Sequence, residues 1–106
     1  MTTIARDAKL VTFINVFTTA PADQPEVLAI LDHVTSTIVR HAPGFVSSSL
    51  HRSIDGTKVV MYAQWRSMED YEAMRANPAP LPFLQQAMKL ATFAPGTYEV
   101  TETYAP

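Results

Sequence analysis

An Asp55-Gly56 pair is the feature of this sequence that most constrains the fold. A two-residue Asp-Gly loop between runs of strand-forming residues is a strong short-range signal for a tight hairpin with a turn of primed type. Residues 45–54 and 57–66 flank the pair and supply these runs. The sequence therefore predicts two antiparallel strands that are neighbours in one sheet.

The expected hairpin assigns the side chains of both strands to two faces. If the strands pair directly across the loop, Val46 lies opposite Trp65 and shares its face, since opposite side chains project to the same side. Leu50 and Met61 lie opposite each other on that same face. The other face is semi-polar and carries Ser47, Ser49, His51, Tyr62 and Gln64. Such a face needs water or another surface to cover it, so we expect a homodimer formed through the sheet.

The N-terminal half predicts one more strand and a helix. Residues 10–18 are rich in branched and aromatic side chains, which favour a strand. A helix is expected to begin at Asp23, whose carboxylate can cap it and which is followed by a proline in the first turn. Apolar residues then recur at steps of three and four until Pro43 and Gly44, which predicts a helix of about five turns.

The C-terminal half repeats the pattern of helix and strand. Ser67 can cap a second helix, and a proline-rich break at residues 77–80 separates it from a further helical stretch over residues 83–90. Residues 97–104 alternate in character and predict the last strand. The order β-α-β-β-α-β is typical of the ferredoxin-like α+β fold, in which one antiparallel sheet has its helices on one side.

Length and composition narrow the class of protein. The chain has 106 residues, of which 47% are hydrophobic, and this fits one domain at residues 10–106 behind a flexible arm at residues 1–9. The net charge of −2 without a basic stripe excludes nucleic acid as the expected partner. The absence of cysteine suits a reducing compartment, so we expect the cytoplasm. No apolar run has the length of a membrane span or a signal peptide.

Metal and nucleophile chemistry are not expected from this sequence. The three histidines, at positions 33, 41 and 51, do not stand at the spacings that metal sites use. The glycines occur singly, so no loop can cradle a phosphate. The serines at 47–49 lie inside a strand, not at the strand-to-helix turn that presents a nucleophile. What remains is an apolar cavity between one sheet face and the helices, which is the general form of a small-molecule site.

Asn15 is the polar residue that stands out in the first strand. It shares a face with Phe13 and Phe17, and a buried amide without partners costs roughly 1–3 kcal/mol. One interpretation is an asparagine that bonds to neighbouring backbone at a bulge. The other is an amide held in a dry pocket, where it can bind an oxygen atom of a ligand.

Trp65 also has two interpretations. It is either an anchor of the core or a flat wall that stacks on an aromatic ligand. Tyr71 lies just inside the following helix and can direct its hydroxyl into the same space, while methionines supply adaptable walls. We therefore expect Asn15 and Trp65 to be the catalytic residues, and a substrate-binding wall made by Phe13, Leu50, Met61, Tyr71, Leu84 and Met88.

With this order of elements, the sequence resembles the antibiotic biosynthesis monooxygenase family, which has the dimeric α+β barrel fold. The resemblance covers about residues 10 to 104. Within the family, the sequence is most similar to the small quinone-forming monooxygenases of aromatic polyketide pathways. It is carried by FINVF at 13–17, APGFVSSSLHRSIDGT at 42–57, VVMYAQW at 59–65 and the serine, glutamate, aspartate and tyrosine of 67–71.

The resemblance implies roles for particular residues. The strand asparagine of the family matches Asn15, its tryptophan matches Trp65, and a helix tyrosine of one branch matches Tyr71. A second asparagine of the quinone-forming members falls on Met61, whose thioether cannot position an oxygen as an amide can. The haem-degrading branch has a histidine where this chain has Arg75, which argues against haem degradation.

The resemblance also implies a reaction that needs neither metal nor flavin. A hydroxyaromatic substrate would lose a proton, its carbanion would pass an electron to dioxygen, and the resulting peroxide would collapse to a quinone. Our leading hypothesis is therefore a cofactor-independent monooxygenase that acts on a small aromatic substrate. Two alternatives stay open: a non-oxidative cyclase or isomerase in the same pocket, and a dimeric binding or scaffold protein whose pocket is filled around Met61.

Overall fold

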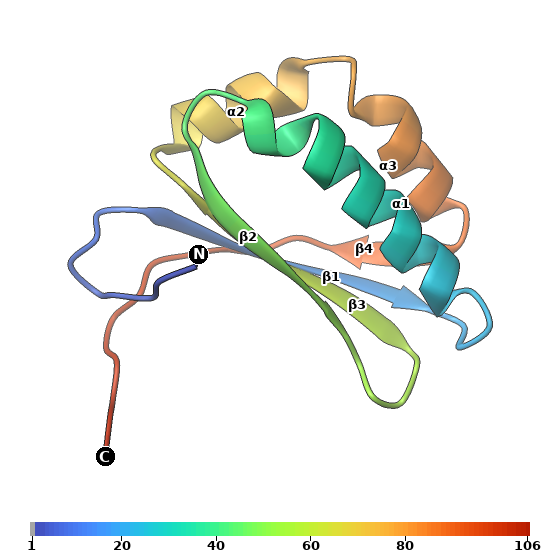
Figure 1. Cartoon of the computed structure of the whole chain (residues 1–106), viewed down its shortest axis with the longest axis horizontal. Coiled ribbons are helices and arrows are strands. Elements are labelled where there is room, and N and C mark those ends of the chain that lie inside the picture. Colours follow the sequence, from blue (N-terminus) through green and yellow to red (C-terminus); the bar gives the residue numbers. More distant parts are fainter. Residues whose placement is uncertain (1) are drawn as a thin grey trace.

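The computed structural model describes residues 2–106, which form an antiparallel sheet covered on one face by helices (Figure 1). The sheet order is β2-β3-β1-β4, and β5 also pairs with β1. This order confirms the predicted ferredoxin-like α+β fold. The elements in chain order are β1 (Val11–Thr19), α1 (Gln24–Thr37), a short 3-10 helix η1 (Val39–His41), β2 (Phe45–Arg52), β3 (Lys58–Trp65), α2 (Met68–Ala76), α3 (Leu81–Met88), β4 (Ala91–Ala94) and β5 (Thr97–Tyr98).

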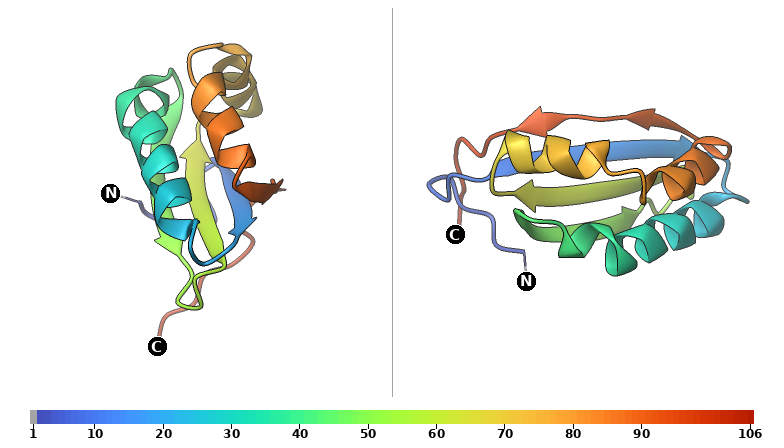
Figure 2. Two further views of the ribbon diagram at one scale, coloured as in Figure 1. Left: turned by 90° about the vertical axis from the view of Figure 1, so that its right-hand side faces the viewer. Right: turned by 90° about the horizontal axis from the view of Figure 1, so that it is seen from above.

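Helices α1 and α3 lie side by side over the sheet, and α2 covers the end where β3 finishes (Figure 2). The side chains that β1 and β3 direct toward the helices form two buried clusters. One cluster contains Phe17, Val27, Leu31, Val59 and Ala87, and the other contains Phe13, Ala63 and Trp65. Asn15 lies between the two clusters on β1, and Met61, its partner on β3, packs against both.

Helix α1 is shorter at its C-terminal end than the sequence predicts. It ends at Thr37, not near Pro43. The hydroxyls of Ser36 and Thr37 donate to the carbonyl of His33 at 3.3 and 2.6 Å, and such side-chain bonds compete with the helical backbone. The expected side-chain cap is also wrong, because Asp23 makes no side-chain cap and only its carbonyl accepts the first helical bonds.

The hairpin has the predicted register but not the predicted turn. Leu50 pairs with Met61, as expected. The loop is longer than two residues, since the N–H of Ser53 donates to Lys58 and that of Gly56 donates to Ser53. Only the glycine of the Asp-Gly pair has a positive φ, so the turn is not of primed type. The backbone N–H and hydroxyl of Thr57, with the Ser53 hydroxyl, lower the pKa of Asp55 to about 2 and stabilise this wider turn.

A bulge at Val46 corrects a second part of the hairpin prediction. The register shifts between Phe45 and Ser47, so Phe45 and not Val46 lies opposite Trp65. Val46 is 45% exposed, while the Phe45 ring meets the indole edge-on at 5.4 Å between centroids. The bulge thus places the larger aromatic surface in the core.

The last strand also differs from the prediction. It begins at Ala91 and is interrupted at Pro95 and Gly96, which gives the short strands β4 and β5 where residues 97–104 were expected to form one strand. Proline has no N–H for the ladder, so the regular pairing with β1 stops there. Residues 99–106 form no strand and run away from the sheet (Figure 1).

The face of the sheet away from the helices is covered in part by the N-terminal arm. Gln64 is 3% exposed, donates to the carbonyl of Thr3 at 2.7 Å and accepts from Ser47 at 2.8 Å. Thr2 in turn donates to Ser47 at 3.2 Å. The polar groups at this end of the reverse face therefore satisfy one another. Within residues 2–106, every helix is too short or too polar to span a membrane.

Candidate active site

A cavity of about 480 Å³ lies between the helix-facing side of the sheet and the three α-helices. This volume is in the range of small-molecule sites. The lining residues with exposed side chains come from α2, the segment between α2 and α3, α3 itself and Lys89 directly after it, so this helical pair forms the mouth. The cavity brings together seven of the residues that the sequence predicts for a site: Phe13, Asn15, Met61, Trp65, Tyr71, Leu84 and Met88.

Leu50 is the predicted wall residue that does not line this cavity. It lies on the edge strand β2, and its partner Met61 on β3 stands between it and the cavity. Leu50 packs instead against the cluster that contains Phe17, and it lines a separate hollow beside α1. Leu50 is therefore on the predicted face of the sheet, but its strand lies too far from the cavity for it to be a wall residue.

Asn15 is the polar residue at the middle of the cavity floor. Its Oδ1 is buried and has no hydrogen-bond partner among the described residues. The pairing of β1 with β3 runs without interruption from Val11 to Thr18, so the interpretation of a bulge that satisfies this amide is wrong. Met61 lies opposite, and its thioether is a weak acceptor that donates nothing. A polar atom left unsatisfied at this depth costs stability unless a bound molecule supplies a partner.

Trp65 contributes little exposed surface to the cavity. Its side chain is 1% exposed, and it meets Phe45 and Tyr71 edge-on at centroid distances of 5.4 and 5.8 Å. This packing supports the interpretation of Trp65 as a core anchor at the cavity wall. A ligand can stack on the full indole face only if one of these neighbours moves.

Tyr71 joins the cavity wall to its mouth. Its ring stacks on Phe13 at 3.8 Å between centroids, with 18° between the ring planes. Its hydroxyl accepts a hydrogen bond of 3.2 Å from Nη1 of Arg75, which also lines the cavity. The predicted hydroxyl is therefore held at the mouth by a cation.

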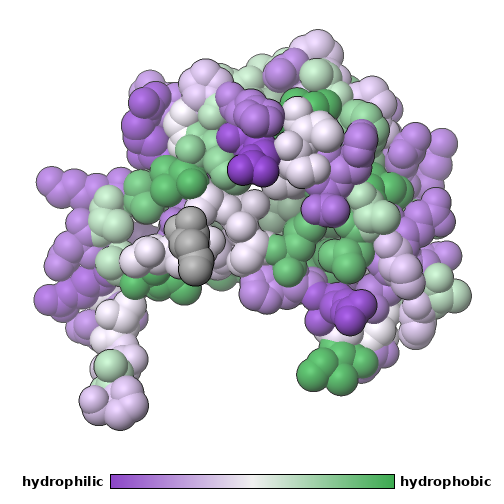
Figure 3. Space-filling model, viewed as in Figure 1, coloured by the Kyte–Doolittle hydropathy of each residue, from purple (hydrophilic) through white to green (hydrophobic). Residues whose placement is uncertain are grey.

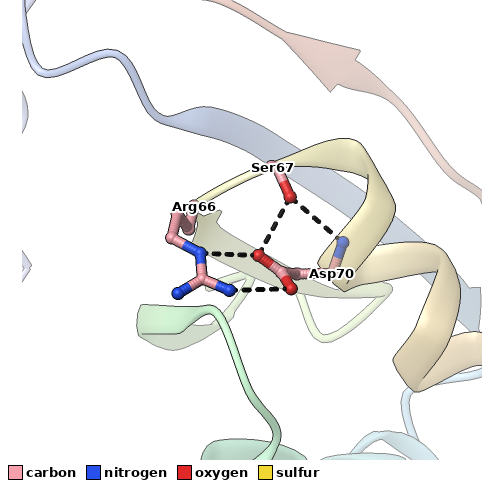
Figure 4. A network of polar contacts seen from close by, with 3 residues as sticks. All are labelled: Arg66, Ser67 and Asp70. Atoms are coloured by element: carbon pink, nitrogen blue, oxygen red, sulfur yellow. Dashed lines mark hydrogen bonds and ion pairs between the residues drawn. The ribbon is translucent and has the colours of Figure 1, made fainter.

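A polar network fixes the start of α2 and hence the position of Tyr71 (Figure 4). Asp70 accepts from Nε and Nη2 of Arg66 at 2.8 and 3.0 Å and from the Ser67 hydroxyl at 2.9 Å, and its N–H donates to Ser67 in the predicted cap. The bonds from Arg66 and Ser67 hold the pKa of Asp70 below its ordinary value. Gly44 has a φ of +84° and lies against Asp70, whose side chain a Cβ at this position would overlap.

The charged residues of the cavity are all cationic. Arg75 and Lys89 line it, and no aspartate, glutamate or histidine of the described chain does so. Neither cation has a carboxylate partner within residues 2–106. The described chain also has no cluster of three residues that could hold a metal ion. The cavity therefore favours an anionic group and contains no side chain suited to be a general base.

Four of the cavity residues that sequence reasoning missed are Phe45, Arg75, Lys89 and Thr35. Phe45 was not identified because the bulge moves it into the place expected for Val46. Arg75 and Lys89 were not identified because a cation near a helix end is typical of solvated surface. Thr35 was not identified because one threonine in a helix carries no distinctive spacing. A polar residue on the apolar stripe beside Val34 is the signal that could have found Thr35.

Comparison with known proteins agrees with this architecture. A sequence model of the antibiotic biosynthesis monooxygenase family matches residues 10–85. The tetracenomycin-F1 monooxygenase of Streptomyces glaucescens is 42% identical over 104 residues, which cover 98% of this chain and 93% of that protein.

Several solved structures share the fold. SnoaB, a cofactor-independent oxygenase from Streptomyces nogalater, matches with a TM-score of 0.73 and 30% identity over 91% of this chain and 97% of its own. A monooxygenase from the gene ActVA-Orf6 of Streptomyces coelicolor, solved in complex with nanaomycin D, matches with a TM-score of 0.76 and 25% identity over 92% of each chain. The family match over most of the sequence and the relative of 42% identity show that this chain belongs to the antibiotic biosynthesis monooxygenase family.

Proposed function

We propose that this protein is a cofactor-independent monooxygenase that oxidises a small hydroxyaromatic compound of polyketide type with dioxygen to a quinone. The observation that carries the proposal is the buried Oδ1 of Asn15, which has no partner in the described chain, in an apolar cavity of small-molecule size. Similarity to a tetracenomycin-F1 monooxygenase and to the cofactor-independent oxygenase SnoaB supports the reaction class.

In the proposed reaction the substrate supplies the electrons. The hydroxyaromatic loses a proton, and its anion passes one electron to dioxygen. The two radicals combine to a peroxide, which collapses so that one oxygen atom forms the new carbonyl and the other leaves as water. The substrate carbon is oxidised and dioxygen is reduced, so the balance requires no further redox partner.

The protein acts on the anion at two places. The Nδ2 group of Asn15 donates a hydrogen bond to the substrate oxygen as negative charge develops on it, in a site where low dielectric strengthens the bond, and its Oδ1 accepts from a neighbouring substrate hydroxyl. Arg75 and Lys89 favour the anionic form from the mouth, and no carboxylate of the described chain opposes them there. Because the cavity has no general base among its described residues, the proton passes to water.

The alternative of a filled, non-catalytic pocket is disfavoured by the cavity itself. That alternative needs Met61 to join Phe13, Trp65 and Leu84 in one packed cluster. Leu84 instead packs with the Phe17 cluster, and space remains between the two clusters. Met61 removes one possible amide from the site but does not close it.

Oxygen uptake tests the proposal. The purified protein, treated with a chelator, should consume dioxygen with anthrone or a dihydroxynaphthalene and without added metal or flavin. Asn15→Ala should lower the rate about a hundredfold, because one preorganised hydrogen bond is lost. Thr18→Ala, an exposed change on the same strand, is the matched control. Product formed at the same rate without dioxygen would contradict the proposal and favour a cyclase or isomerase.

We also propose that two copies associate through the reverse face of the sheet. The arm covers only the Gln64 end, and Ile14, Val16, Val60 and Tyr62 remain partly exposed on this side. Apolar surface also reaches the hairpin tip (Figure 3). Ile54, in the hairpin loop, is fully exposed. Sedimentation velocity at micromolar concentration should show a dimer that Val60→Glu weakens. A monomer under these conditions would contradict this proposal.

A further inference from the structure

Two buried side-chain polar atoms in the described chain have no hydrogen-bond partner, and both belong to residues of the same cavity. They are Oδ1 of Asn15 and Oγ1 of Thr35. Asn15 lies on the sheet, and Thr35 lies on α1, the helix that covers it. Native proteins leave few buried polar atoms unsatisfied, so two in one cavity call for a common explanation.

The hydroxyl of Thr35 could have found a partner within its own helix. A threonine hydroxyl commonly bonds to the carbonyl three or four residues earlier. The next two residues, Ser36 and Thr37, make such bonds to His33. Thr35 makes none, although its position is less exposed than theirs. Hydrogen bonding within the helix therefore does not explain the hydroxyl at position 35.

The surroundings of Thr35 also do not require a hydroxyl. The preceding Val34 is 1% exposed and lies on the apolar stripe of α1, where Leu31 is equally buried. Valine has nearly the shape of threonine and would bury no polar atom at position 35. Folding alone would thus favour valine, while Thr35 lines the main cavity as well as the hollow beside α1.

We propose that Thr35 is a second substrate-contacting residue, which hydrogen-bonds to an oxygen of the ligand from the helix side while Asn15 bonds from the sheet side. The nature of the ligand rests on the proposed function. Two polar atoms on different walls select an aromatic ring system with at least two oxygen substituents on separate edges. Thr35 thereby supplies a polar contact in a cavity where Met61 offers none.

Binding of a redox-inert probe tests this inference separately from catalysis. The probe is 1,8-dihydroxyanthraquinone, titrated by its visible absorbance against the full chain. Thr35→Val should weaken its binding about tenfold, and Thr35→Ser should restore binding to within about threefold, because serine keeps the hydroxyl. Thr37→Val is the matched control, since this exposed hydroxyl already bonds to His33.

Thermal unfolding supplies the second readout. Thr35→Val should keep or raise the Tm, because it removes an unsatisfied hydroxyl. A lower Tm would show that the hydroxyl is satisfied in the free protein, by water in the hollow beside α1, and would overturn the inference. Unchanged probe affinity in Thr35→Val, or no binding by the parent protein, would overturn it as well. Weakened probe binding in a protein without oxygen uptake would refute the proposed function but leave this inference standing.

Discussion

The two faces of the sheet differ in whether a buried side-chain amide has hydrogen-bond partners within the protein. On the reverse face, Gln64 bonds to Ser47, Tyr62 and the carbonyl of Thr3, so its amide is satisfied on both ends. On the helix face, the amide oxygen of Asn15 is buried and bonds to nothing in the described chain. The same chemical group is therefore satisfied within the protein on one side and has an oxygen without a protein partner on the other. The predictions below test this difference.

The reverse face should show the largest loss of stability. Gln64→Leu removes one amide and leaves the Ser47 hydroxyl and the Thr3 carbonyl without that partner, so we expect the free energy of unfolding to fall by about 2–3 kcal/mol. Urea unfolding measures the change. A loss below about 0.5 kcal/mol would show that the polar cluster on this face is not structural.

The helix face should accept a new polar group with a gain in rate. Met61→Asn places a second amide opposite Asn15, and we expect oxygen uptake to rise about tenfold. Stability should fall by about 1–2 kcal/mol, because the methionine packs against both clusters. Leu50→Asn, on the same face but outside the cavity, is the control and should lower stability without raising the rate. A slower Met61→Asn enzyme would contradict the view that a second amide opposite Asn15 assists the reaction.

The paired carboxylate of Asp70, at the start of α2, should contribute to the stability of the fold. Asp70 has a lowered pKa because Arg66 and Ser67 donate to its carboxylate. Its contribution to stability is present above the unfolded pKa of 3.8 and is lost as the pH falls toward the lower folded value. We expect Asp70→Asn to destabilise the protein slightly at pH 7 and to flatten the acid limb of the unfolding free energy against pH. An unchanged acid limb would remove the proposed role of this network.

The smallest effect is expected at the mouth of the cavity. Arg75 is exposed, so water and salt screen its charge. Arg75→Gln should raise the KM for a substrate that binds as an anion about two- to fivefold and reduce the salt dependence of kcat/KM. Arg40→Gln, which is outside this cavity, is the control. An equal change in both variants would mean that only the overall charge matters.

The sequence was sufficient to predict the order of strands and helices and seven residues of the cavity, but not the bounds of the last strand or the end of α1. Alternating and helical patterns identify which face each residue joins, and the family likeness identifies Asn15, Trp65 and Tyr71. The bulge at Val46 was not predictable because it depends on tertiary contacts of Phe45. The wider turn around Asp55 was not predictable because it depends on side-chain hydrogen bonds within the loop. Thr35 was missed for a related reason: only the fold shows that its hydroxyl is buried without a partner.

The central claim is that the Asn15 amide binds a ligand and does not stabilise the fold. Asn15→Leu tests it most directly, because leucine branches at Cγ as asparagine does and leaves no polar atom to satisfy. We predict a free energy of unfolding that is unchanged or about 1 kcal/mol higher in urea, together with oxygen uptake that falls about a hundredfold. A protein that loses stability, or that keeps its oxygen uptake, would contradict the claim.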